Sequence, residues 1–151
     1  MPESPDGPET PKTPETGRVH TGSGFGRMLV AVYAVFAISA TARSGVQLVL
    51  HFDDAPVAYL LSAFAAVVYI VATIALARRG PVAEKVAAVA IGVELVGVLV
   101  VGTLTVLDPE LFPDATVWSG FGEGYGYIPL LLPIVGMWWV VRTHRLNRRT
   151  V

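Results

Sequence analysis

The chain contains three long apolar stretches, and each is about as long as a helix that crosses a lipid bilayer. They cover residues 28–50, 57–77 and 86–107. A hydrocarbon core about 30 Å thick needs about 20 helical residues, so each stretch fits one span. A fourth stretch, residues 127–141, is shorter and contains two prolines. With 53% hydrophobic and 15% charged residues, the composition favours an integral membrane protein.

Charges between the apolar stretches predict how the chain crosses the membrane. Arg78, Arg79 and Lys85 lie between the second and third stretches, and four arginines follow the fourth. The other two connections carry aspartate and glutamate but no lysine or arginine. Loops rich in lysine and arginine stay in the cytoplasm, and only four spans put all of them on that side. We therefore expect an all-α membrane protein, a four-helix transmembrane bundle in the cell (plasma) membrane with both termini cytoplasmic.

Two flanking segments differ from the apolar stretches. Residues 1–27 are rich in Pro, Glu, Thr and Gly, which predicts a disordered cytoplasmic tail. The transmembrane domain then covers 28–142, and 143–151 form a basic cytoplasmic tail. The Ala-Thr-Ala sequence that ends at Ala42 resembles a signal-peptidase site, so cleavage there is an alternative. The long acidic leader and the apolar residues 46–50 favour an uncleaved first helix.

Two charged residues are expected inside the membrane. Glu94 lies in AIGVELVGVLVVG, with apolar residues for about two helical turns on either side. An ionised residue at the centre of a span costs about 2.5–3.5 kcal/mol, so such a carboxylate is usually protonated, paired or functional. Arg43 heads a polar stripe with Gln47 and His51, at the four-residue spacing of one helix face.

These residues predict an intramembrane polar site or ion pair formed by Arg43, Gln47 and Glu94. The pairing of Arg43 with Glu94 would make the first and third helices neighbours. Such a pair would either only fix the helix register or form a proton- or ligand-linked site. The alternative for Arg43 is that it extends to the outer headgroups.

The two acidic connections are expected on the outer face. Contributors to a surface there are His51, Asp53, Asp54 and Glu123. The loop 108–126 mixes acids, aromatic residues and alternating glycines. The expected interfacial aromatic belt contains Trp118, Phe121, Tyr125 and Tyr127, with Trp138 and Trp139 on the inner side. A cation- or partner-binding role for this acidic surface stays open.

Several classes of function lack a sequence signal. The absence of cysteine removes disulfides, thiol nucleophiles and cysteine-ligated metals. The three histidines are far apart in sequence, so we expect no metal site and no cofactor. The chain has no basic surface for nucleic acid and no recognisable catalytic set, so we expect that it is not an enzyme.

Three segments carry a family resemblance: RSGVQLVLHFDDAPVAYLLSAFAAVVYIVA, ELVGVLVVGTL and DPELFPDATVWSGFGEGYGYIPLLLPIVG. They resemble a family of small integral membrane proteins from actinobacteria whose function is not established. The resemblance covers residues 28–142 and implies a four-span cell-membrane protein, without catalytic or ligand residues to transfer. Small multidrug transporters are also four-helix proteins, but their membrane glutamate lies in the first helix and here it lies in the third.

The function that we expect is a non-enzymatic accessory or assembly component of a membrane complex. The short loops and the small bundle favour it. The alternative is a small oligomeric transporter or channel that uses an intramembrane Glu/Arg site. The expected partners are the lipid bilayer and either another membrane protein or further copies of the chain.

Overall fold

The structure, a computed structural model, describes residues 21–147, which are helical over most of their length and contain no strand. The long helices are α1 (Thr21–Leu50), α2 (Pro56–Ala77), α3 (Pro81–Leu107) and α4 (Ile128–Asn147). Between α3 and α4 lie the short 3₁₀ helices η1 (Pro109–Leu111), η2 (Ser119–Phe121) and η3 (Glu123–Tyr125). The expectation of an all-helical fold is confirmed.

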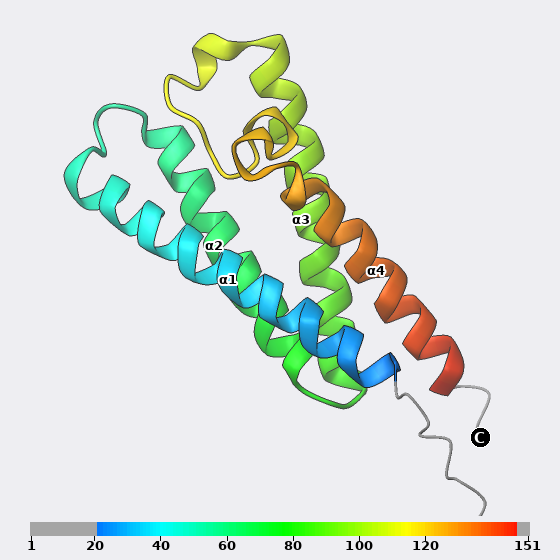
Figure 1. Ribbon diagram of the computed structural model, residues 1–151. Coiled ribbons are helices and arrows are strands. Elements are labelled where there is room, and N and C mark those ends of the chain that lie inside the picture. The colour runs from blue at the N-terminus through cyan, green and yellow to red at the C-terminus, as the bar shows by residue number, and fades with distance from the viewer. Residues whose placement is uncertain (1–20, 148–151) are drawn as a thin grey trace, which may run out of the picture.

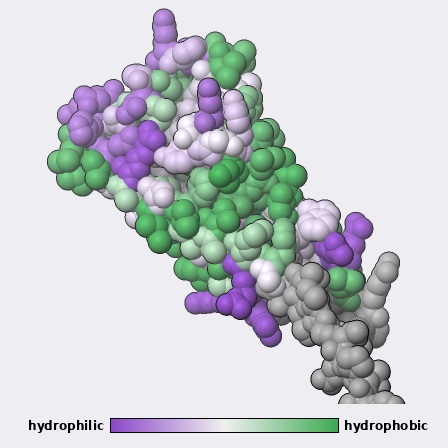
Figure 2. Space-filling model, in the orientation of Figure 1, coloured by the Kyte–Doolittle hydropathy of each residue, from purple (hydrophilic) through white to green (hydrophobic). Residues whose placement is uncertain are grey.

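The helices pack in chain order, α1 along α2, α2 along α3 and α3 along α4 (Figure 1). The start of α1, the α2–α3 turn and the end of α4 lie together at one end of the bundle. We call this the basic end, and its described arginines are Arg27, Arg78, Arg79, Arg142 and Arg145. The other two connections form the acidic end, which carries Asp53, Asp54, Asp108 and Glu110. Figure 2 shows a hydrophobic zone between hydrophilic side chains at the two ends.

Three of the described helices are long and apolar enough to cross a membrane: α1 from Gly24 onward, α2 and α3. The count becomes four if α4 is joined to the η2–η3 segment, from which it is bent by 100°. Figure 1 shows why α4 needs this addition, because it begins part of the way along the bundle. Its apolar part also ends before Arg142. These lengths are consistent with a membrane protein.

Helices α1, α3 and α4 extend beyond their predicted bounds, and α3 begins at Pro81 instead of residue 86. Helix α1 begins at Thr21, so residues 21–27 are helical although we expected them in the tail; residues 1–20 lie outside the described residues. Helix α4 runs to Asn147, so residues 143–147 of the expected C-terminal tail are helical. Residues 148–151 lie outside the described residues. The tail sequence did not reveal the extension of α1, which is accompanied by contacts of Phe25 with α4.

These contacts are aromatic. The ring of Phe25 on α1 stacks on Trp139 of α4, with 6.4 Å between ring centroids. It also meets the edge of Trp138 at 6.3 Å. Aromatic pairs at such distances add stabilisation beyond the area that they bury. The start of α1 is therefore in aromatic contact with the middle of α4.

The loop between α3 and α4 folds back into the bundle. We call residues 112–127 the cap. In the cap, η2 packs against α3, and the side chains of Thr116, Val117 and Trp118 are buried. The prediction that Trp118 lies in an interfacial belt is therefore wrong, whereas Tyr127 is about half exposed. Trp118 can enter the bundle because α3 has a glycine where the ring lies.

Gly97 is that glycine. A Cβ atom at this position would lie 2.5 Å from the Trp118 ring, which is closer than atoms in contact can approach. Gly102, farther along α3, provides the same space for Phe121. The absence of side chains at these two positions is what allows the cap to dock on α3.

We expect Gly97→Ala to lower the thermal stability of the detergent-purified protein, by about 1–3 kcal/mol, because Trp118 must shift to admit the methyl group. The melting temperature followed by size-exclusion chromatography measures this change. The control is Gly45→Ala on α1, where a Cβ atom meets nothing within 4 Å. That substitution should leave stability equal or higher, since alanine favours the helix. Equal melting temperatures for the two variants would contradict docking of Trp118 against Gly97.

Candidate functional site

Glu94 lies in the middle of α3 and is fully buried. Its Oε2 atom accepts a hydrogen bond of 2.7 Å from the hydroxyl of Tyr33 on α1, which is also fully buried. The Tyr69 hydroxyl also interacts with this carboxyl, but Oε1 has no hydrogen bond of good geometry within the described residues. Since a buried polar group is costly without a partner, the Tyr33 hydroxyl is the main compensation that Glu94 receives.

A second hydrogen bond connects the cap to the same region. The indole Nε1 of Trp118 donates to the hydroxyl of Tyr69 on α2 at 3.2 Å. The Tyr69 ring in turn packs against Tyr33, with ring centroids 6.3 Å apart. We call Tyr33, Tyr69, Glu94 and Trp118 the core cluster. It joins α1, α2, α3 and the cap.

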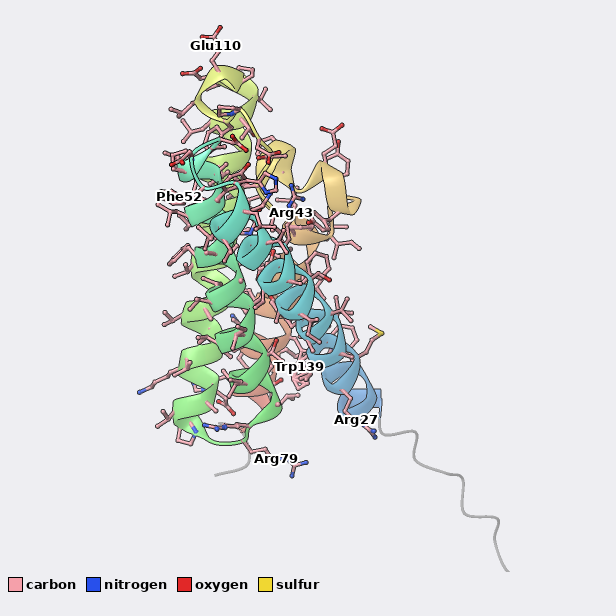
Figure 3. All side chains as sticks on the ribbon, turned by 90° about the vertical axis from the view of Figure 1, so that its left-hand side faces the viewer. Arg27, Arg43, Phe52, Arg79, Glu110 and Trp139 are labelled. Atoms are coloured by element: carbon pink, nitrogen blue, oxygen red, sulfur yellow. The ribbon has the colours of Figure 1, made fainter. Side chains whose placement is uncertain are left out.

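Arg43 does not belong to the core cluster. Its Nη1 donates to the Tyr125 hydroxyl at 3.0 Å, and its Nη2 donates to the Ala115 carbonyl oxygen at 2.9 Å. Both partners lie in the cap, and Figure 3 shows Arg43 beside this segment. Among the described residues, Arg43 forms no ion pair with Glu94. The predicted Arg43–Glu94 pair is therefore wrong in this structure.

The reason is the position of the two residues along the bundle. Tyr33, which reaches Glu94, precedes Arg43 by ten residues of the same helix. At 1.5 Å per residue, Arg43 lies about 15 Å farther toward the acidic end. The prediction that the first and third helices pack as neighbours is therefore wrong, since α1 packs along α2 and reaches α3 only through side chains such as Tyr33.

Gln47 lies one turn beyond Arg43 and also contacts the cap. Its Nε2 donates to Oδ2 of Asp114 at 3.5 Å, and the Tyr59 hydroxyl of α2 donates to the same oxygen at 3.0 Å. The polar stripe on α1 thus faces the cap. Asp114 receives donors from two helices, which holds the start of the cap against α1 and α2.

The contact between the cap and these helices borders a cavity of about 460 Å³ at the acidic end. Of the predicted outer-face residues, His51 and Asp54 line this cavity together with Gln47 and Asp114. Asp53 and Glu123 are exposed and do not line it. The structure therefore brings His51 and Asp54 of the predicted outer surface together with Gln47. None of the predicted outer-face residues lies near Glu94.

Four residues that the sequence did not assign to a site are central to it: Tyr33, Tyr69, Asp114 and Trp118. The two tyrosines had a usable signal, because a tyrosine in the middle of a span needs a partner for its hydroxyl. Asp114 and Trp118 had none, since their contacts exist only after the loop folds back between the helices.

No group of three or more His, Asp or Glu side chains in the described part of the chain could hold a metal ion. No family model, curated protein or solved structure matches the chain.

We expect Tyr33→Phe to lower stability by about 1–3 kcal/mol, because Glu94 keeps its buried carboxyl and loses the hydrogen bond from Tyr33. Thermal unfolding of the purified protein in detergent measures the loss. Tyr127→Phe is the matched control, since Tyr127 is about half exposed and its hydroxyl has no hydrogen bond within the described residues. A Tyr33→Phe protein as stable as this control would rule out a supporting role for the Tyr33–Glu94 bond.

Proposed function

We propose that this protein is a non-enzymatic accessory or assembly component of a membrane complex. The observation that carries the proposal is that the charged side chains within the bundle bind the protein's own elements. Glu94 is bonded to Tyr33, and Arg43 is bonded to two residues of the cap. Both side chains contribute to the architecture, which supports a component that acts through its surfaces.

The closed middle of the bundle also supports this function. The fully buried side chains of Tyr33, Tyr69, Ile91, Glu94 and Val98 form a layer between the two ends. A solute that crossed the bundle would have to displace them. A component that acts by binding a partner gains rigidity from the same packing.

We also propose that the protein lies in the plasma membrane with four spans and both termini in the cytoplasm. The basic end carries arginines from three separate segments, which supports a cytoplasmic location for that end. The cap together with α4 is long enough for the fourth crossing.

One observation favours the second candidate, a small oligomeric transporter or channel. Oε1 of Glu94 is buried and has no hydrogen bond of good geometry in the described part of the protein. A carboxyl with a free acceptor at membrane depth could take up and release a proton. In that function Glu94 would act without Arg43, since the two side chains are not paired.

Glu94→Gln separates the two functions. The tagged wild-type and variant proteins are purified from native membranes in mild detergent, co-purifying proteins are quantified, and proton flux is measured after reconstitution into vesicles. We expect both proteins to retain the same membrane partner in a fixed molar ratio, with no flux that depends on Glu94. A homo-oligomer whose flux is lost in an equally stable Glu94→Gln variant would establish the transporter instead.

The four-span topology can be tested with single cysteines, because the chain has none of its own. We expect Asp54→Cys and Glu110→Cys to react with a membrane-impermeant maleimide in intact cells. Arg79→Cys and Arg145→Cys should react only after the membrane is opened. All four positions are exposed in the structure, so accessibility within the fold does not limit the reaction. Labelling of Arg145→Cys in intact cells would mean that α4 and the cap do not complete a crossing.

A further inference from the structure

The basic end contains a larger cavity of about 910 Å³, within the range of about 300–1,000 Å³ that is typical of small-molecule sites. The ends of all four helices surround it. Its wall is mostly apolar and includes Leu29, Val30, Ala75, Leu76, Trp139 and Val140. It is lined by none of the core-cluster residues, and nothing in the proposed function uses it.

Arginines from two different elements stand at the rim of this cavity. Arg27 comes from α1, and Arg78 and Arg79 come from the α2–α3 turn. Figure 3 shows Arg27 and Arg79 at the same end of the bundle, with Trp139 deeper between them. All three arginines are exposed, and none forms an ion pair with a described carboxylate. The rim therefore offers cationic side chains to an external anion.

The acidic residue at this rim, Glu84, has a histidine as its partner. Oε2 of Glu84 on α3 lies 3.1 Å from Nδ1 of His144 on α4, which bridges the two helices at one side of the cavity. On another side, the Phe25–Trp139 stack joins α1 to α4. These two contacts bound the cavity on two sides. The three arginines outnumber Glu84, so the net charge of the rim is positive.

The rim lies directly at the end of the apolar part of the bundle. The apolar helix α2 ends at Ala77, and Arg78 and Arg79 follow directly. In a membrane protein, arginines at such a boundary lie at the level of the headgroups, and the apolar wall beside them faces the hydrocarbon. A ligand of this cavity therefore needs an anionic head joined to an apolar chain.

We propose that the cavity binds an anionic phospholipid. The phosphate lies between Arg27 and the arginine pair of the α2–α3 turn, since guanidinium groups bind phosphate oxygens through two parallel hydrogen bonds. One acyl chain lies against the apolar wall near Leu29 and Trp139. Inorganic phosphate would leave this wall unused, and a zwitterionic lipid would bring its own positive charge to the rim.

The test titrates the full-length protein in detergent with phosphatidylglycerol or phosphatidylcholine and counts bound lipids by native mass spectrometry. Wild type should bind phosphatidylglycerol more tightly. In the double variant Arg27→Gln, Arg79→Gln this affinity should fall about tenfold or more, because each arginine contributes a charge-assisted contact. The control is Arg142→Gln, Arg145→Gln, which removes the same charge from residues of the same end that do not line the cavity. Its affinity should stay within about twofold.

A further variant tests the apolar wall. Ala31 is exposed and lines the cavity, so Ala31→Trp should fill part of it and weaken phosphatidylglycerol binding without any change of charge. Each variant must match the melting temperature of wild type, and Ala31→Leu replaces the tryptophan variant if that one fails to fold.

The proposal is overturned by equal binding of the two lipids or by equal losses of affinity in the two double arginine variants. It is also overturned by undiminished binding in the cavity-filling variant, or by displacement of the lipid with inorganic phosphate.

Discussion

The hydrogen bond between Tyr33 and Glu94 is the interaction on which the arrangement of the other elements depends. It involves a carboxyl group that is fully buried in the interior of a helical bundle, so bulk solvent cannot reach it to replace a lost donor. It also links α1 to α3, two helices that otherwise meet mainly through α2. The tyrosine ring continues this link sideways to Tyr69, so the polar contact and the aromatic packing hold the same three helices together.

The cap extends this cluster to the acidic end. Trp118 reaches Tyr69 from the loop, Gly97 leaves the space that the indole ring needs, and Arg43 binds the cap from α1. This explains how a chain with a short fourth helix still fills the acidic half of its bundle. The loop buries Thr116, Val117 and Trp118, and its polar atoms are bonded partly by side chains of the helices around it and partly within the loop.

The two ends of the bundle have different chemistry. The cavity at the acidic end is lined by Gln47, His51, Asp54 and Asp114, whereas the one at the basic end has an apolar wall and an arginine rim. Between them lies a layer of fully buried side chains. A closed middle with two accessible ends supports a protein that acts by binding at its surfaces, and the basic end is the part suited to a lipid headgroup.

The sequence by itself determined the helical class, the approximate bounds of α2 and α3, and the presence of a buried carboxyl at Glu94. These follow from local properties, namely the length of apolar runs and the cost of a charge in hydrocarbon. Only the tertiary structure decided that Tyr33 holds Glu94, that Arg43 binds the cap, and that Trp118 enters the core. The physical reason is that these contacts depend on how far each helix is shifted along its neighbours and on the return of a loop between them. The periodicity of a single segment encodes neither, so it does not tell which groups come within hydrogen-bonding distance.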